Sequence, residues 1–222
     1  LYPKLPYDPR KDLAGVSLMG VSPLLAAVNL DAPFKTAREL IDYARANPGK
    51  VSFGSSGNGS AAHLTTELWK SLTKTYMIHI PYRGAVPALT DLMGGQIQLF
   101  FDAPTGLINQ AKAGKIRLIG VAGDKRLPAV PDVPTFKELG MKDISARFGV
   151  GFVVPAGTPA SVVKTISDDV AIIMNDPAFV KQYVAPMSYV ATSKGTEEYK
   201  AFLRRDAAIQ QERVTAAGVK LD

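Results

Sequence analysis

The chain has 222 residues, of which 46% are hydrophobic and 21% charged, an ordinary globular composition that excludes disordered and collagen-like classes. It contains no cysteine, which excludes disulfides, thiolate catalysis and cysteine-based zinc or iron–sulfur sites. The net charge is +6, but the basic residues are scattered and form no stripe interleaved with aromatic residues, so no nucleic-acid partner is expected.

Short apolar runs alternate with helical patterns, which is typical of βα units and predicts an α/β class with a mainly parallel sheet. The first helix is expected to start at the capping-box pair Thr36 and Glu39 and to stop at 47–49. A strand over 51–53 then runs into a glycine-serine segment, and Ser60 is expected to cap a helix. The buried stripe of that helix is predicted at Ala61, Leu64, Leu68 and Leu72.

The strand–turn–helix pattern recurs along the rest of the chain. Further strands are expected at 77–80, 97–101, 116–122 and 148–154, the last two as fully buried strands. Further helices are expected through 86–93, 104–111, 159–175, 177–184 and 196–217. The longest apolar stretches, at 24–30 and 150–154, are far shorter than the roughly 20 residues of a membrane helix.

The glycine-serine segment 54–60 (GSSGNGS) lies between a predicted strand and a predicted helix, where backbone N–H groups and the helix dipole favour an anion. It is not a P-loop, because Ser60 and Ala61 replace the lysine and hydroxyl residues, and it fits neither G-x-G-x-x-G nor G-x-S-x-G. A tight turn that uses glycine for positive φ is the alternative, but seven small polar residues exceed what a turn needs. The segment is therefore interpreted as ligand-binding.

Polar residues also follow the next two predicted strands. Tyr82, Arg83 and Gly84 come after the strand at 77–80, and Asp102 comes after the strand at 97–101. Alone, Arg83 would be a surface residue and Asp102 a cap for the helix that begins at Pro104. Three consecutive strand ends with polar groups instead predict a ligand cleft at the carboxyl edge of the sheet.

The two histidines, His63 and His79, have no partner at metal-ligand spacing, and each is expected to be a helix or strand residue with a satisfied hydrogen bond. No metal or other cofactor is expected. No acid pair, histidine–nucleophile arrangement or thiol is recognisable, which favours recognition over catalysis. Trp69 and the pair Phe100 and Phe101 are expected in the core.

Six segments, in order and spacing, resemble the Bug family, the extracytoplasmic binding receptors of tripartite tricarboxylate transporters. These segments are 1–9 (LYPKLPYDP), 54–60 (GSSGNGS), 80–84 (IPYRG), 88–96 (ALTDLMGGQ), 131–135 (PDVPT) and 155–159 (PAGTP). The resemblance implies a type II periplasmic binding protein, with two α/β domains joined by crossing strands around a cleft. It also implies a monomeric periplasmic receptor without enzyme activity, from which a signal peptide has been removed.

The resemblance further implies which ligand is bound and where. The receptor would capture a small organic acid, such as a di- or tricarboxylate, an acidic amino acid or an aromatic acid, and deliver it to an integral membrane permease. Asp102 would meet a hydroxyl, an amine or a bridging water of the ligand, because two bare carboxylates repel each other. The carboxylate would be held by Ser55, Ser56, Gly57, Asn58, Ser60 and Ala61, with Tyr82, Arg83 and Gly84 on the same wall.

Family members begin with a βαβ unit that this sequence is expected to lack. Residues 1–30 and 151–222 are accordingly assigned to an incomplete first domain and 31–150 to a second domain. Two other functions stay open. One is an enzyme acting on small carboxylates, with Asp102 as general base and Arg83 as electrostatic stabiliser. The other is an effector-sensing regulatory domain, which would need a helix-turn-helix that the sequence does not encode.

Overall fold

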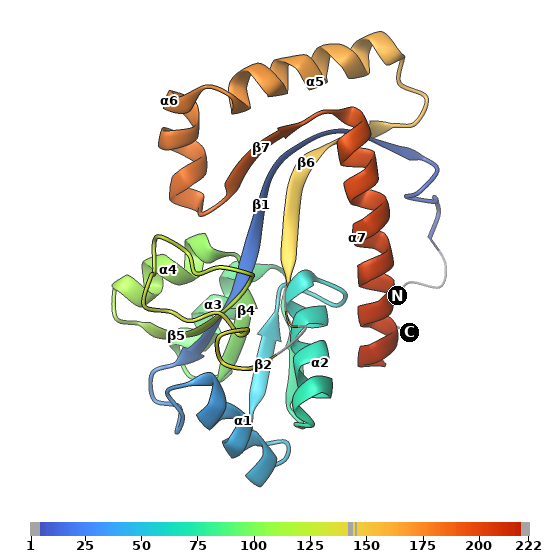
Figure 1. Cartoon of the computed structure of the whole chain (residues 1–222). Coiled ribbons are helices and arrows are strands. Elements are labelled where there is room, and N and C mark those ends of the chain that lie inside the picture. The colour runs from blue at the N-terminus through green and yellow to red at the C-terminus, as the bar shows by residue number, and fades with distance from the viewer. Residues whose placement is uncertain (1–4, 142–143, 145, 219–222) are drawn as a thin grey trace. The chain divides into compact units, whose positions relative to one another are not determined.

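The computed structural model describes residues 5–141, 144 and 146–218, and Figure 1 colours the chain from its N-terminus to its C-terminus. The chain divides into two units, each with its own internal contacts. Of the described residues, unit 1 comprises Pro23–Arg147 and 213–218, and unit 2 comprises 5–22 and Phe148–Glu212. This division into contact units does not test the domain limits expected at 30 and 151, which remain a prediction.

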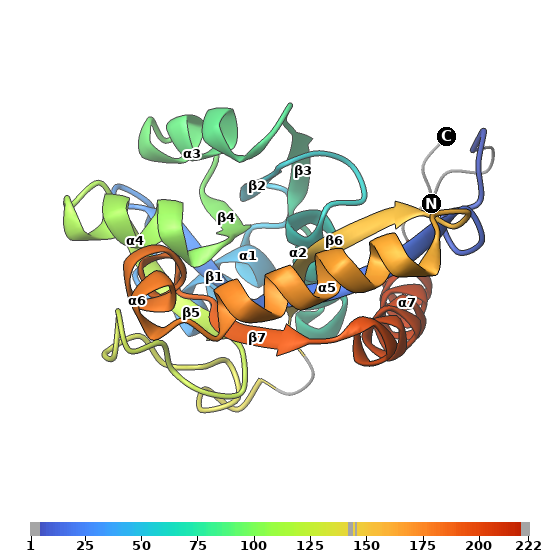
Figure 2. The ribbon, with the colours of Figure 1, turned by 90° about the horizontal axis from the view of Figure 1, so that it is seen from above.

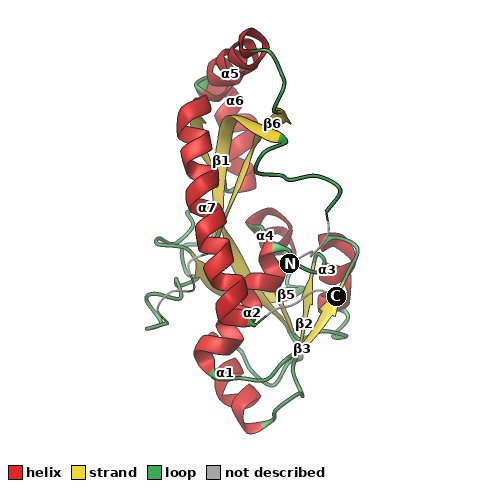
Figure 3. Cartoon of the chain, turned by 90° about the vertical axis from the view of Figure 1, so that its right-hand side faces the viewer, coloured by secondary structure: helices red, strands yellow, loops and turns green. Residues whose placement is uncertain are grey.

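Unit 1 is built on five strands in the order β3-β2-β4-β1-β5. β2 pairs in parallel with β3 and β4, whereas β1 runs antiparallel to β4 and β5. β1 therefore runs opposite to the other four strands, which share one direction, and the α/β class with a mainly parallel sheet is confirmed. Figure 3 shows the helices and strands of the chain by colour. The strands are β1 (Leu13–Asn29), β2 (Ser52–Ser55), β3 (Ile78–Pro81), β4 (Leu99–Asp102) and β5 (Ile116–Ala122). The helices are α1 (Ala37–Ala46), α2 (Ala61–Thr73), α3 (Ala85–Met93) and α4 (Pro104–Lys112).

The first helix begins where the capping-box spacing predicts. The Thr36 Oγ1 accepts the N–H of Glu39 at 3.2 Å, and the Glu39 carboxylate accepts the N–H of Lys35 at 2.7 Å. The reciprocal bond thus reaches the residue before the N-cap rather than the N-cap itself. Both bonds satisfy donors that would otherwise lack a partner at the start of the helix.

Helix α2 is buried over most of its circumference, and this alters its predicted stripe. Leu64 and Leu68 are buried as expected, but Ala61 is exposed and Leu72 is 48% exposed. The buried face includes His63, Thr65, Thr66 and Trp69. Polar residues on the inner face hide the apolar periodicity, so the stripe could not be placed from hydrophobic residues alone.

The core of unit 1 contains an aromatic cluster of Trp69, Phe101 and Phe136, whose ring centroids lie 5.4–5.7 Å apart. Trp69 is only 1% exposed, and the predicted core positions Phe100 and Phe101 are fully buried. The pairs are edge-on, tilted and stacked, and such arrangements add stabilisation beyond the burial of their area. The cluster joins α2 to β4 and to the segment after β5.

In unit 2, β1 pairs with β6 (Arg147–Pro155) and β7 (Val190–Lys194), and α5 (Ala160–Met174) lies along these strands in Figure 2. The predicted helix at 177–184 is split into α6 (Pro177–Phe179) and a π-helical turn, η1 (Val180–Val184), followed by the 3-10 turn η2 (Ala185–Met187). Helix α7 (Thr196–Ala217) has the predicted limits. In the described part, no helix combines the length and the apolar character needed to cross a membrane.

The prediction that the strand at 148–154 is fully buried is wrong. Phe152 and Val153 of β6 are each 46% exposed, and most other residues of this strand are exposed or half-buried. Among the described strands, β6 pairs with β1 alone and therefore lies at a sheet edge. A continuous apolar run is typical of an interior parallel strand, but it does not reveal on which sides the strand is covered.

Glycines allow α7 to pack closely on the sheet of unit 2. A Cβ added at Gly151 would lie 2.5 Å from the Ser17 carbonyl oxygen and 2.6 Å from the Tyr199 ring. At Gly149, a Cβ would lie 3.0 Å from the Phe202 ring. At Gly149 the ring would have to shift by a few tenths of an ångström, whereas at Gly151 the backbone oxygen leaves no room for a methyl group. Gly151 therefore requires glycine for reasons of space rather than of backbone angle.

Replacing Gly151 by alanine is therefore expected to destabilise unit 2 by about 1–3 kcal/mol through overpacking. The unfolding temperature should fall by several degrees in a thermal denaturation experiment followed by circular dichroism. Gly157→Ala is the matched control, because a Cβ at Gly157 meets no atom within 4 Å. Equal unfolding temperatures for the two variants would contradict the packing argument.

Candidate ligand-binding site

Three neighbouring strands of unit 1 end at one edge of the sheet. β2 lies between β3 and β4, parallel to both, and the register places Ser55 opposite Pro81. The segments that leave these strands are the β2–α2 loop (Ser56–Ser60), the turn Tyr82–Gly84, and the chain after Asp102. The polar segments that the sequence places after three strands therefore lie along the same edge.

The β2–α2 loop is closed by hydrogen bonds of its own. Ser55 Oγ donates to the carbonyl of Gly57 at 3.0 Å and accepts the N–H of Gly57 at 3.2 Å. The N–H of Ser60 donates to the same carbonyl at 3.2 Å. Gly57 and Gly59 have φ of +131° and +77°, the region that favours glycine. The tight turn considered from the sequence is thus present and holds the other polar groups of the loop in place.

The loop runs directly into the first turn of α2. As predicted, Ser60 is the N-cap, and its hydroxyl accepts the N–H of His63 at 3.3 Å. The first N–H groups of a helix, here those of Ala61 and Ala62, have no acceptor within the helix and carry partial positive charge. This end of α2 therefore offers donors to an anion. Among the predicted contact residues, Ser55 is buried, Ser56 is half-buried, and Asn58 and Ala61 are exposed.

The turn after β3 divides its polar groups between the protein and the solvent. The Tyr82 hydroxyl donates to Asp91 of α3 at 2.7 Å, and burial together with this hydrogen bond raises the pKa of Tyr82 to about 12. Gly84 is the N-cap of α3 with φ of +108°, and Arg83 is exposed. The Tyr82 hydroxyl is thus already engaged, and the guanidinium of Arg83 is the exposed cation of this turn.

Asp102 is the last residue of β4 and is partly buried. Burial raises the pKa of Asp102 to about 6, against a smaller lowering by the hydrogen bond from the Ala103 backbone. The interpretation of Asp102 as the cap of the following helix is wrong. α4 begins at Pro104, so the N-cap position belongs to Ala103, and no side chain caps this helix. Asp102 therefore presents a carboxyl group that changes its charge near neutral pH.

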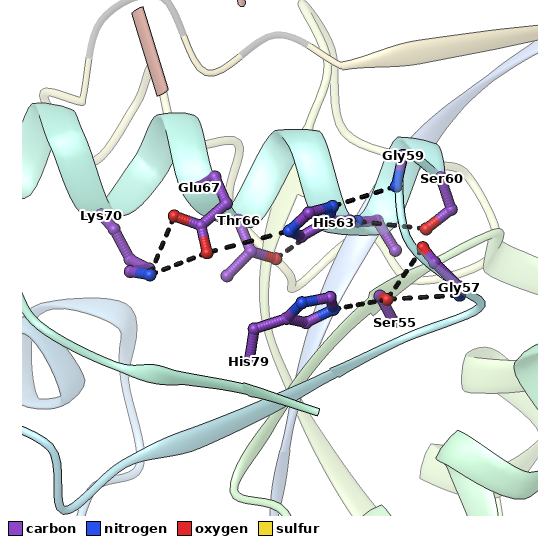
Figure 4. Close-up of polar contacts among 10 residues, drawn as sticks. Ser55, Gly57, Gly59, Ser60, His63, Thr66, Glu67, Lys70 and His79 are labelled. Atoms are coloured by element: carbon purple, nitrogen blue, oxygen red, sulfur yellow. Dashed lines mark hydrogen bonds and ion pairs between the residues drawn. The ribbon is translucent and has the colours of Figure 1, made fainter. Parts of the chain in front are cut away.

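His63 and His79 form a stacked pair beside the loop (Figure 4). Their ring centroids are 3.9 Å apart with an interplanar angle of 11°, and the His79 ring stacks in turn on Phe53 at 4.9 Å. The Nδ1 of His63 accepts the N–H of Gly59 at 3.1 Å, and the Nε2 of His79 lies 2.7 Å from Ser55 Oγ. The expectation that each histidine has a satisfied hydrogen bond is confirmed, but their stacking was not predicted.

Both imidazoles are held in the neutral form. Burial lowers the pKa of His63, and the nearby Lys70 adds to this lowering while Glu67 opposes it. The pKa of His79 is lowered to about 4 by burial, by His63 and by Lys70. Lys70 donates to both carboxylate oxygens of Glu67 at 2.7 and 2.8 Å, and its Nζ lies 5.3 Å from the centre of the Phe53 ring.

The pair Ser55 and His79 has the spacing of a nucleophile and its base, but its chemistry differs. Ser55 is 0% exposed. Its single hydroxyl hydrogen is directed to the Gly57 carbonyl, which leaves His79 Nε2 as the donor rather than as the acceptor of a proton. A pKa of about 4 makes His79 a weak base. The contact is therefore structural.

The sequence profile of the family described as "Tripartite tricarboxylate transporter family receptor" matches residues 1–213. The chain belongs to this receptor family. One family relative, the "UPF0065 protein in tcbD-tcbE intergenic region" of Pseudomonas sp. (strain P51), is 34% identical over 170 residues. The match covers 76% of this chain and 51% of that relative, so the chain spans about half the relative's length.

Solved structures agree with membership of the receptor family. The structure titled "R. palustris Rpa4515 with adipate" has a TM-score of 0.93 at 27% identity, covering 98% of this chain and 73% of that one. The "periplasmic binding protein BugD" has a TM-score of 0.91 at 28% identity, covering 99% of this chain and 74% of that one. The Bug-family resemblance predicted from six sequence segments is thereby confirmed.

In this receptor-family chain, no group of three or more His, Cys, Asp or Glu residues in the described part could hold a metal ion. The predicted contact residues from the β2–α2 loop, the Tyr82–Gly84 turn and Asp102 all belong to unit 1. His63 is the residue that sequence reasoning left out of the site. A signal was present, because Ser60 and His63 have the same spacing as the capping-box pair Thr36 and Glu39.

The raised pKa of Asp102 predicts how a variant will respond to pH. With a pKa of about 6 against 3.8 for an ordinary Asp, the folded state retains a proton that the unfolded state has released. The carboxyl group therefore favours folding below about pH 4, and this contribution is lost as the pH rises through about 6. Asp102→Asn should raise the unfolding temperature at pH 7.5 and leave it nearly unchanged at pH 4.

The measurement is the difference in unfolding temperature between variant and wild type at each pH, followed by circular dichroism. Asp42→Asn is the control, because Asp42 is exposed on α1. A difference for Asp102→Asn that is the same at both pH values would show that burial does not raise the pKa of this carboxyl group.

Proposed function

We propose that the chain acts in a periplasmic receptor that binds a small organic acid without changing it and delivers the acid to a membrane permease. The observation that carries the proposal is the β2–α2 loop, whose internal hydrogen bonds leave the start of α2 open to an anion. Membership of the receptor family supports the same function. A further support is the adipate named with the relative from R. palustris, because adipate is a dicarboxylate.

The proposed anchor holds one carboxylate through the main chain. The N–H groups of Ala61 and Ala62 begin α2, and the dipole of the 13-residue helix adds a favourable potential at this end. Ser56 and Asn58 are the loop side chains nearest to solvent that can add hydrogen bonds, directly or through water. Arg83, exposed after the neighbouring strand, contributes a positive charge to the same edge.

The receptor function is preferred to catalysis for reasons of geometry. Ser55 is buried with its hydrogen committed to Gly57, and His79 is a poor base, so this pair does not supply a nucleophile. One observation does favour the enzyme alternative, since a pKa of about 6 suits Asp102 to general-base chemistry. Incubation of the full-length protein with organic acids, followed by mass spectrometry of the supernatant, tests this, and product formation would overturn the receptor proposal.

Asp102 is proposed to choose between ligands. A ligand with an amine or hydroxyl beside its carboxylate can donate a hydrogen bond to Asp102, worth roughly 1.5–3 kcal/mol when charge-assisted. A plain dicarboxylate would instead face a second negative charge once Asp102 is ionised, that is, above a pH of about 6. The carboxyl group therefore favours hydroxy or amino acids over plain dicarboxylates at neutral pH.

Ser60→Ala tests the anchor. Loss of this N-cap should cost about 0.5–2 kcal/mol of stability, and adipate affinity, measured by titration calorimetry on the full-length protein, should fall further than partial unfolding explains. Thr36→Ala is the matched control, because Thr36 caps α1 through the same kind of bond and belongs to no predicted contact. If both variants bind adipate as tightly as the wild type does, the β2–α2 loop is only a turn.

Asp102→Asn tests ligand choice. At pH 7.5, the replacement should weaken malate or aspartate binding by about tenfold or more and leave succinate binding unchanged or stronger, because it removes a repulsive charge. The measurement is calorimetric titration of paired ligands into the wild type and the variant. Equal losses for succinate and malate would mean that Asp102 supports the fold of this edge and does not contact the ligand.

A further inference from the structure

The end of the β2–α2 loop forms a capping box in which a histidine takes the usual place of a glutamate. In the α1 box, Glu39 accepts the N–H of Lys35 at 2.7 Å, and in the turn that starts at Thr135, Glu138 accepts the N–H of Thr135 at 2.7 Å. At α2, the residue in the corresponding position is His63, whose Nδ1 accepts the N–H of Gly59 at 3.1 Å. The His63 bond joins the same positions relative to the N-cap as the Glu39 bond does, but its acceptor is an imidazole.

Because the acceptor is a histidine and not a glutamate, the hydrogen bond to the Gly59 N–H depends on protonation. A carboxylate remains an acceptor through the whole neutral and mildly acidic range, whereas Nδ1 of an imidazole accepts only while it carries no hydrogen. The bond from Gly59 therefore defines the tautomer of His63, with its hydrogen on Nε2, 4.0 Å from Glu67. A proton on Nδ1 would point at the Gly59 N–H, and the bond would be lost.

The surroundings of His63 keep its imidazole neutral. His79 of β3 covers one face of the ring at 3.9 Å, so protonation of both would place two like charges in contact. Within the described part, the charged side chains that face the pair come from α2: Glu67, which attracts a proton to His63, and Lys70, which repels one. β2 contributes only Phe53 and Ser55 to this cluster.

The two imidazoles hold the two ends of the β2–α2 loop. His79 contacts Ser55, where the loop leaves the strand, and His63 binds Gly59, where the loop enters the helix. Gly59 immediately precedes Ser60, so its position sets how the chain turns into the first N–H groups of α2 (Figure 4). Loss of the Gly59 bond therefore changes the part of the loop that is proposed to hold the ligand.

We propose that His63 is the positioning residue of the β2–α2 loop: its neutral imidazole holds Gly59 so that the start of α2 can bind a carboxylate, and acidification releases the ligand. This inference rests on the proposed function. Tighter binding in acid would also have a clear physical cause. If His63 did not position the loop, its protonated imidazole would simply attract the negatively charged ligand. Because Asp102 also changes its charge near pH 6, the two roles are separated by comparison with a His63 variant that keeps Asp102. Relative to such a variant, a positioning role lowers carboxylate affinity in acid, and a merely electrostatic role raises it.

The experiment is calorimetric titration of adipate into the full-length protein at pH 7.5, 6.0 and 4.5, with wild type, His63→Gln and His63→Phe. The glutamine carbonyl accepts the Gly59 N–H at every pH, as in an ordinary capping box. His63→Gln should therefore bind within about threefold of wild type at pH 7.5. The ratio of wild-type to His63→Gln affinity should fall at least fivefold between pH 7.5 and pH 4.5. The ratio is used because the protonation of adipate affects both proteins equally and cancels. His63→Phe, which keeps a ring but no acceptor, should bind about three- to tenfold more weakly at pH 7.5.

Glu39→His is the matched control. It places the same titratable acceptor in the capping box of α1, which follows the end of β1 at the opposite edge of the sheet from the loop. This variant should lose thermal stability in acid while its adipate affinity keeps the wild-type pH profile. If Glu39→His changes that profile as much as His63→Gln does, the effect is one of global stability and the inference is wrong.

A second readout needs no ligand. Hydrogen exchange of the Gly59 amide, followed by NMR, should be slow in wild type at pH 7.5 and lose protection in acid, after correction for intrinsic exchange, whereas His63→Gln should keep it. Failure of adipate to bind wild type at pH 7.5 counts against the proposed function and leaves this readout to decide the role of His63. Binding with identical pH profiles in wild type and His63→Gln overturns the inference and leaves the receptor function intact.

Discussion

The pairing of β2 with β3 and β4 positions the three strand ends from which the groups of the candidate site extend. Side chains alternate along a strand, so the register that sets Phe53 beside His79 brings Phe53, Ser55 and His79 to the face covered by α2. A slip of one residue would turn His79 to the other face and leave Ser55 and His63 without their present neighbours. The parallel direction matters equally, because it brings the loop, the Tyr82 turn and Asp102 to one edge.

Local hydrogen bonds explain why buried polar groups are tolerated beneath the loop. Ser55, His63 and Thr66 are almost inaccessible to solvent, and each has a hydrogen-bond partner within the unit. Unpaired, such groups would each cost on the order of 1–3 kcal/mol. The polar network beneath the loop and the turn geometry of its glycines therefore support the same loop conformation.

Local signals predicted much of this fold. The capping-box spacing of Thr36 and Glu39, the N-cap at Ser60 and the long α7 all depend on neighbours in sequence, and the structure has them where the patterns indicate. Long-range relations were less accessible. The 17-residue β1 runs antiparallel to its neighbours, and β6 is exposed although its sequence is apolar. Strand order and coverage depend on partners distant in sequence, which periodicity does not report.

In the candidate site, too, local features were predicted from the sequence and long-range contacts were not. The glycine-serine segment and Asp102 are visible in the sequence because each directly follows a strand pattern. The stacking of His63 on His79 arises only when α2 packs on β3, and 15 residues separate the two rings in the chain. Tyr82 was expected on the wall of the site, and the structure shows that its hydroxyl donates to Asp91, nine residues further on. Sequence reasoning thus located the edge of the sheet, and the structure determined how its side chains are engaged.

The aromatic cluster of unit 1 has a practical consequence for spectroscopy. Trp69 is the single tryptophan of the chain, it is almost fully buried, and it lies on the helix whose first turn carries the candidate anchor. Unit 2 contains tyrosines but no tryptophan. Emission excited at the red edge of the absorption band, where only indole absorbs, therefore reports on unit 1 alone. Comparison with circular dichroism, which averages over both units, separates their melting without any label.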